Sequence, residues 1–122
     1  MYIKDRKECR EIVALDNCRL RELLNPRRKS RLKIRFSLAE ARVRPGHETL
    51  SHKLKSSEVY YILEGRGEMR IDAERRRVGP GQAILIPPRS IQSIRNTGRR
   101  ELVFLCLVDP AWKAEDEETV ST

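Results

Sequence analysis

The sequence predicts an all-β domain, either a sandwich or a small barrel, and three observations support this fold class. From residue 32 onward, short segments alternate apolar and polar residues, as antiparallel strands with one buried face do. Turn-forming residues separate these segments at regular intervals, for example at Pro45-Gly46 and at Gly79-Pro80-Gly81. The chain of 122 residues is long enough to bury one hydrophobic core and too short for two domains.

The alternating pattern predicts eight strands, at residues 32–43, 49–54, 58–64, 67–72, 75–78, 82–86, 91–95 and 101–108. The segment 11–24 is ambiguous, because its leucines partly fit a helix while Asp16-Asn17 is typical of a turn between two strands. We favour two strands there. The chain then divides into an N-terminal strand or arm at residues 1–19, a barrel at 20–113, and an acidic tail at 114–122 that we expect to be flexible.

Charge is unevenly distributed along a chain whose formal net charge is +8. Residues 1–108 hold 25 basic and 13 acidic groups, which give +12, whereas residues 109–122 hold one basic and five acidic groups, which give −4. A basic body attracts nucleic acid through the phosphates. However, aromatic residues make up only 5% of the chain, and the sequence has neither a helix-turn-helix pattern nor an aromatic stacking platform. We therefore expect no specific nucleic-acid partner.

The sequence offers no candidate membrane span or secretion signal. The longest uncharged apolar stretch, residues 102–108, is far shorter than the roughly 20 residues that a membrane helix needs, and residues 1–6 lack the apolar run of a signal peptide. The cysteines Cys9, Cys18 and Cys106 form no Cys-x-x-Cys pair, and their odd number cannot pair completely. We expect a cytoplasmic protein with reduced thiols and no membrane partner, in which Cys106 is a small buried apolar residue.

Two stretches of the chain match the spacing of one protein family. Residues 45–65 contain His52 and Glu58 and resemble the first cupin motif, G-x5-H-x-H-x(3,4)-E-x6-G. Residues 81–96 are similar to the second cupin motif, G-x5-P-x-G-x2-H-x3-N. The resemblance implies a cupin fold, which is a double-stranded β-helix or jelly-roll barrel of six or more strands. It also implies that both motifs contribute to one cavity.

The resemblance bears on metal binding as well, but two ligands of the family's site are replaced. In metal-binding cupins, two histidines and a glutamate of the first motif and one histidine of the second hold a Mn, Fe, Ni or Zn ion. His52 and Glu58 stand at two of these positions, whereas Leu54 and Gln92 replace histidines. The resemblance thus implies, at most, a weakly held divalent metal on His52, Glu58 and Gln92, because leucine has no electron pair to donate and an amide oxygen is a weak ligand. The alternative, which we favour, is a metal-free patch in which these three side chains hydrogen-bond to one another.

Alternation along residues 58–63 separates the side chains that face the cavity from those that face outward. Tyr60 and Ile62 share the parity of Glu58 and are expected inside the barrel. His52, Glu58 and Tyr60 are therefore the candidate catalytic residues. The opposite face carries an apolar row that predicts a homodimer, formed by Val59, Tyr61 and Leu63.

Other polar and aromatic residues lie in or near the motif strands. Basic groups that reach the cavity mouth would favour an anionic ligand, and the candidates are Lys53, Arg70, Arg89 and Arg95. Trp112 is expected to cap the hydrophobic core. His47 directly follows a turn glycine and is expected to be an exposed loop residue.

The sequence thus predicts a small barrel that binds a small polar or anionic organic ligand and has a degenerate metal site. The alternative is a metal-dependent cupin enzyme, such as a dioxygenase, an isomerase or epimerase, or a decarboxylase, that acts on a small oxygenated substrate. Without a metal, His52 and Glu58 would remain an acid–base pair. The ligand itself does not follow from the sequence, because one fold hosts many reactions.

Overall fold

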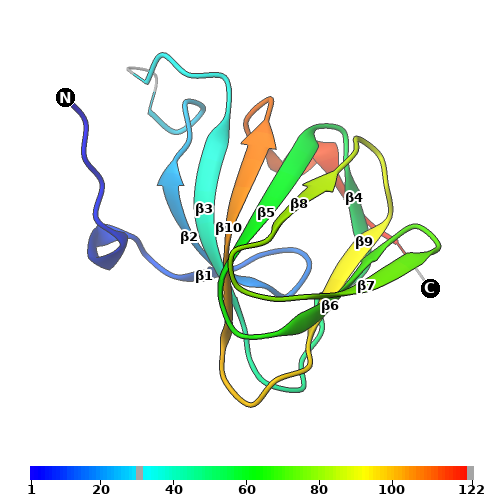
Figure 1. Cartoon of the computed structure of the whole chain (residues 1–122). Helices are drawn as coiled ribbons and strands as arrows, with labels where there is room; N and C mark the ends of the chain where they lie inside the picture. The colour runs from blue at the N-terminus through cyan, green and yellow to red at the C-terminus, as the bar shows by residue number, and fades with distance from the viewer. Residues whose placement is uncertain (30–31, 121–122) are drawn as a thin grey trace.

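The computed structural model describes residues 1–29 and 32–120 as two antiparallel sheets that face each other across one interior (Figure 1). The strands are β1 (Ile12–Val13), β2 (Arg19–Leu24), β3 (Ser37–Val43), β4 (His52–Leu54), β5 (Ser57–Glu64), β6 (Gly67–Ile71), β7 (Glu74–Val78), β8 (Ala83–Ile86), β9 (Gln92–Asn96), β10 (Leu102–Asp109) and β11 (Glu117–Thr119). The six-stranded sheet has the order β1-β2-β3-β10-β5-β8, and the five-stranded sheet has the order β11-β4-β9-β6-β7. This arrangement confirms the all-β jelly-roll prediction.

Helical structure in the described residues is confined to two 3₁₀ turns, η1 (Arg6–Glu8) and η2 (Ala114–Asp116). Asp5 caps η1, because its side chain accepts a hydrogen bond of 2.8 Å from the backbone N–H of Lys7. Within residues 1–29 and 32–120, no helix has the length and apolar character needed to cross a membrane.

The ambiguous segment 11–24 is a β-hairpin, as favoured from the sequence. Strand β1 pairs with β2, with Ile12 opposite Leu20, and Asn17 turns the chain with a φ of 70°. The Asp16 side chain holds this turn by accepting a hydrogen bond of 3.0 Å from the backbone N–H of Cys18. The hairpin extends the six-stranded sheet and brings Asp16 to the barrel interior.

Two expected strands are shorter than the alternating pattern indicates. The strand expected at 32–43 begins at Ser37, and the one expected at 49–54 begins at His52. In the stretch before Ser37 the alternation is real, since Leu32, Ile34 and Phe36 are half-buried while the residues between them are exposed. A segment that lies against the barrel without joining a sheet gives the same pattern, so alternation alone overestimates these strands.

The acidic segment 114–120 is ordered secondary structure where the sequence predicts a flexible tail. Strand β11 adds to the edge of the five-stranded sheet, with Glu117 opposite Leu54 and Thr119 opposite His52. Edge strands offer unpaired N–H and C=O groups, and this segment satisfies those of β4. Residues 114–119 of the segment expected to be a flexible tail thus form a 3₁₀ turn and an edge strand, while residues 121–122 lie outside the described part of the chain.

The core fills the space between the sheets around Phe104, whose ring lies 4.4 Å from that of Tyr60 between centroids. Tyr60 and Ile62 are buried, whereas Tyr61 and Leu63 are exposed, which confirms the predicted facing along β5. The three cysteines are free and buried. The apolar core thus surrounds Phe104, while buried polar side chains outside the site, such as Asn96 and Thr49, are held by hydrogen bonds to the backbone.

Two turn positions of the motifs adopt the left-handed backbone conformation. Gly65 has a φ of 86°, and a Cβ placed there would lie 2.5 Å from the backbone oxygen of Glu101, so only glycine fits. Arg89, which stands where the second motif has glycine, has a φ of 65°. The turn thus keeps its shape without the glycine, at the conformational cost of a left-handed arginine.

Candidate functional site

A cavity of about 270 Å³ opens inside the barrel at the end formed by β1, β4 and β11. Most of its wall is apolar, formed by Ile12, Val13, Ala14, Leu15, Leu20, Ala39, Val108, Trp112 and Ala114. Its polar lining consists of Asp16, Cys18, Glu22, Ser37, His52, Glu58, Tyr60, Cys106 and Glu117. Because Val13 and Leu15 are exposed, solvent reaches the cavity along the N-terminal hairpin.

The two motifs bring His52, Glu58 and Gln92 together across the barrel. His52 on β4 is the cross-strand neighbour of Gln92 on β9, and Glu58 enters from β5 of the opposite sheet. The Gln92 amide Nε2 donates a hydrogen bond of 2.8 Å to Glu58 Oε1. All three residues are buried, with Gln92 only 1% exposed.

The surroundings of Glu58 favour its neutral form. Burial raises the pKa of Glu58 from 4.5 to about 7, because the carboxylate loses its hydration. The hydrogen bond from Gln92 and the nearby His52 oppose this shift and do not cancel it. At neutral pH Glu58 is therefore present both as a carboxylic acid and as a carboxylate, which suits a group that accepts and returns a proton.

His52 is held by hydrogen-bonding groups at both ring nitrogens. Nδ1 lies 3.0 Å from the backbone oxygen of Leu50, and because a carbonyl oxygen only accepts, Nδ1 carries a proton. Nε2 lies 3.6 Å from Oδ2 of Asp16. Asp16 is 6% exposed and lines the same cavity. The orientation of the imidazole is thus fixed by a backbone oxygen on one side and a carboxyl group on the other.

The remaining polar groups of the cavity keep their protons. Burial is the largest cause that raises the pKa of Tyr60 well above its ordinary value, so its hydroxyl is a donor and not a base. Burial likewise raises the pKa values of Cys18 and Cys106, which therefore remain thiols. A thiol is a poor nucleophile, in agreement with the interpretation of Cys106 as an apolar residue.

These side chains do not fit a resident divalent metal ion. Leu54, 4% exposed, occupies the inward position two residues after His52 and offers no electron pair. Gln92 directs its N–H₂ group at Glu58, which places donor hydrogens beside the carboxylate that a cation would need. Across residues 1–29 and 32–120, no three His, Cys, Asp or Glu side chains are arranged to hold a metal ion.

Three carboxyl groups of the cavity escaped the sequence analysis, those of Asp16, Glu22 and Glu117. Asp16 is typical of a turn and Glu117 belongs to an acidic run, so neither carries a periodic or motif signal. Glu117 Oε1 accepts a hydrogen bond of 3.0 Å from Trp112 Nε1, while its Oε2 is buried without a partner. Trp112 itself lines the cavity, whereas the sequence favours a cap on the hydrophobic core over a role at the pocket.

The four basic residues expected near the cavity mouth do not line the cavity. Lys53 and Arg95 follow inward-facing residues by one position and therefore point outward, where they approach Glu118 (3.6 Å) and Glu68 (3.8 Å). Arg70 lines a different, surface pocket together with Arg95, and Arg89 lies in an exposed turn. His47 is exposed, as expected.

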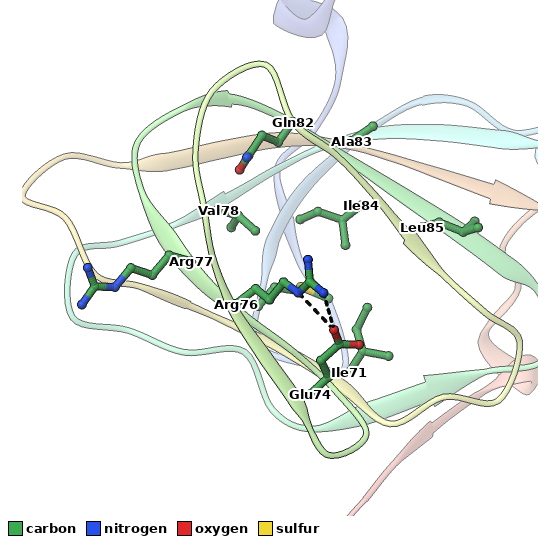
Figure 2. A pocket seen from close by; sticks show the side chains of 10 residues that line it. Ile71, Glu74, Arg76, Arg77, Val78, Gln82, Ala83, Ile84 and Leu85 are labelled. Carbon is green, nitrogen blue, oxygen red and sulfur yellow. Dashed lines mark hydrogen bonds and ion pairs between the residues drawn. The ribbon is translucent and has the colours of Figure 1, made fainter.

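A second pocket, of about 440 Å³, lies beside β7 and β8 and contains none of the candidate residues (Figure 2). Its lining includes apolar side chains such as Ile71 and Ile84, with Arg76 lying 3.0 Å from Glu74 over them. Figure 2 shows Arg77 pointing away from this ion pair. The pocket presents no titratable side chain other than these surface charges, so the barrel cavity is the candidate site.

Comparisons with known proteins agree with this geometry. A family model described as Cupin domain matches residues 39–108. An uncharacterized protein from Methanocaldococcus jannaschii is 44% identical over 107 residues, which cover 87% of this chain and 84% of that protein. A 5-nitrosalicylic acid 1,2-dioxygenase from a Bradyrhizobium species is 30% identical over 69 residues, which cover 57% of this chain and 33% of that enzyme. The solved structure of a polyketide cyclase from Streptomyces resistomycificus has a TM-score of 0.80 at 21% identity, covering 100% of this chain and 87% of that one, which shows the fold.

Proposed function

Because this chain belongs to the cupin family, we propose that it is a metal-independent binding protein that holds a small organic molecule in its barrel cavity. The observation that carries the proposal is the cavity of about 270 Å³, in which Glu58 and His52 lie among apolar side chains. An apolar cavity of about 150 Å³ is large enough to bind benzene. The cavity therefore has room for a substituted ring or an alkyl chain of similar volume, with its polar group beside Glu58 and His52.

The proposal excludes a resident metal on the ground of the donor set. A catalytic metal site usually keeps three good protein ligands and one open position. Here Leu54 removes one of them, and Gln92 already donates its amide hydrogens to Glu58. Any role of the site then depends on hydrogen bonds and burial of apolar surface, which are the ordinary determinants of small-molecule binding.

Trp112 provides the direct test, because it is the only tryptophan and lines the cavity. Chelator-treated protein is titrated with benzyl alcohol while the tryptophan emission is recorded. We expect a saturable change in emission, and amide chemical-shift changes confined to the residues that line the cavity. The absence of saturation, or shift changes spread over the outer surface, would refute binding in the cavity.

A matched pair of variants tests whether benzyl alcohol binds inside the cavity. Ala39→Phe fills part of the cavity, because Ala39 lines it from β3, and is expected to abolish the emission change. Ala73→Phe adds the same ring at an exposed turn between β6 and β7 and is expected to leave it intact. Circular dichroism of both variants shows whether the barrel is folded, and the shift map of the wild-type protein decides the question if Ala39→Phe does not fold.

A second function, metal-independent acid–base catalysis, is favoured by one observation, the pKa of about 7 of Glu58 within the cavity. As a carboxylate, Glu58 would take a proton from carbon next to a carbonyl group and return it to the same or a neighbouring atom, without net change in oxidation state. Phenylacetone in D₂O is the probe, since its exchange of hydrogen for deuterium is followed by NMR. Catalysed exchange that rises with pH through about 7 and is lost in Glu58→Gln supports this function. Exchange no faster than in buffer contradicts it.

A further inference from the structure

The cavity is lined by more carboxyl groups than basic side chains. Four carboxyl groups line it, those of Asp16, Glu22, Glu58 and Glu117, whereas no lysine or arginine does among the residues that the structure describes. Of these four, Glu22 is paired with Arg28 from outside the lining. His52 is the one basic side chain of this wall, and it already faces Asp16. An anionic ligand would enter a field of its own sign, which costs free energy in a poorly hydrated interior.

Two acceptor oxygens of this region are buried and have no hydrogen-bond donor. Glu117 Oε2 is one, on a residue whose other oxygen is held by Trp112. Gln92 Oε1 is the other, on a residue that is 1% exposed, whose amide nitrogen is bound to Glu58 and which lies behind the residues that line the cavity. Buried polar atoms are almost always paired, so an unpaired acceptor indicates a partner that arrives from outside the chain.

The partner of such oxygens must donate hydrogen bonds. Near Glu117 the protein supplies no further donor to the free oxygen, because the Trp112 indole N–H is used by Oε1 of Glu117 and the Gln92 amide by Glu58, while the Tyr60 hydroxyl is a separate donor of the cavity wall. The apolar remainder of the wall, including Leu20 and Val108, contacts carbon and not polar groups. The complementary molecule therefore has an apolar body and one end that carries N–H or O–H groups and no negative charge.

We propose that the cavity selects a small primary amine with an aromatic or alkyl body, in preference to the hydroxyl analogue and against the carboxylate. This inference rests on the proposed function, since it names the ligand class of the same cavity. It reverses the sequence expectation of an anionic ligand, because the arginines and the lysine on which that expectation depends face outward. The ammonium group would lie at Glu117, the carboxyl group with a free buried oxygen.

Three probes that share one ring test the proposal by isothermal titration of the wild-type protein: benzylamine, benzyl alcohol and benzoate. We expect benzylamine to bind at least about tenfold more tightly than benzoate, as the loss of a charge-assisted hydrogen bond implies. Benzoate binding as tightly as benzylamine, or more tightly, overturns the charge selection while binding in the cavity stands. Binding of none of the three, nor of toluene, overturns the proposed function and this inference together.

Glu117→Gln and Glu118→Gln form a matched pair on β11. The first removes the charge inside the cavity and keeps an oxygen for the Trp112 indole, while the second removes an exposed carboxylate that faces Lys53. We expect Glu117→Gln to weaken benzylamine binding about tenfold and to change benzyl alcohol binding little, and Glu118→Gln to change neither. Equal benzylamine affinity in the wild type and in Glu117→Gln overturns the assignment of the ammonium group to Glu117.

Discussion

Gln92 donates a hydrogen bond of 2.8 Å to Glu58 across the barrel, from the five-stranded sheet to the six-stranded sheet. The bond joins the two motifs at their most buried polar residues, and it does so with an amide where the family pattern has a histidine. An amide both donates and accepts, so it satisfies a carboxyl group without a cation. This hydrogen bond thus joins the two sheets inside the barrel.

The first prediction concerns the pH dependence of stability. Burial raises the pKa of Glu58 from 4.5 to about 7 in the folded chain, so the folded state binds the proton more tightly than the unfolded state. The contribution of Glu58 to the stability of the folded state is therefore fully favourable below pH 4.5 and is lost as the pH rises through about 7. Glu58→Gln removes this titration. Relative to the wild type, the variant should gain about 3 kcal/mol in free energy of unfolding between pH 4 and pH 8.

Urea unfolding at a series of pH values measures this difference. Glu118→Gln is the control, because it removes an exposed carboxylate from the neighbouring strand. Other titrating groups are common to all three proteins and cancel in the comparison. Glu40 is an example: burial opposes ionisation, but hydrogen bonds from Arg6 and Arg42 together with their charges lower its pKa overall. A difference between Glu58→Gln and wild type that is constant over this pH range would show that the carboxyl group is not buried as described.

A second prediction separates two costs of a left-handed backbone. Gly65 and Gly81 both have a φ of 86°, but a Cβ at Gly65 would meet the backbone of Glu101 at 2.5 Å, whereas Gly81 has nothing within 4 Å. Gly81→Ala should cost only the conformational penalty, roughly 1–2 kcal/mol. Gly65→Ala adds a clash with backbone that cannot move aside and should cost about 4 kcal/mol or more. Thermal unfolding of both variants checks this order, and equal losses would contradict the close approach.

Most of the strand positions along the chain follow from the sequence because half-buried strands alternate. The predicted facing of Tyr60 and Ile62 is an example, since one register places both inside. The same rule overextends the strand before Ser37, because alternation reports burial and not pairing. Strand β11 could not be predicted from its charged residues, since its formation depends on the edge that β4 exposes, and that edge exists only in the folded barrel.

The residues of the candidate site likewise include some that the sequence predicts and some that only the fold reveals. His52, Glu58 and Gln92 occupy motif positions, so their spacing alone is enough to select them. Asp16 and Glu117 reach the cavity from a turn and from the C-terminal strand, and only tertiary contacts bring them there. The two expectations of ligand charge differ for this reason: the polar or anionic ligand expected from the sequence rests on basic residues of the motif strands, whereas our proposal of an amine rests on the carboxyl groups that the two terminal segments add.

A third prediction concerns assembly, for which we propose a homodimer formed through the outer face of the six-stranded sheet. Leu107, Val59 and Leu85 are cross-strand neighbours on that face, and Leu85 is 67% exposed. Adjacent apolar side chains of this kind mark interaction surfaces. Light scattering of the wild type should give twice the 14.3 kDa chain mass, and Leu107→Lys should give the monomer. Ile3→Lys, at an exposed residue outside the barrel, is the control, and a wild-type monomer at micromolar concentration would refute the dimer.

The last prediction concerns the affinity of the site for a divalent metal ion. Leu54 faces inward two residues after His52, and Gln92 lies opposite His52 on β9, so Leu54→His and Gln92→His together place two more imidazoles beside His52 and Glu58. Four such ligands form the kind of site that Zn, Ni and Mn occupy. The double variant should therefore bind these ions more tightly than the wild type by orders of magnitude, as measured by isothermal titration after chelator treatment.

The control for that experiment carries the same two histidines on the outer face of the same strands, as Lys53→His and Arg95→His. It should bind metal as weakly as the wild type, because outward imidazoles do not converge on Glu58. Tight stoichiometric binding by the wild type would mean that Gln92 turns its oxygen to the ion and releases Glu58, and the metal-independent proposal would then be wrong. If the double variant binds metal no better than the wild type, the barrel has repacked around position 54. The loss of the Leu54 side chain is then enough to keep a metal ion from the site.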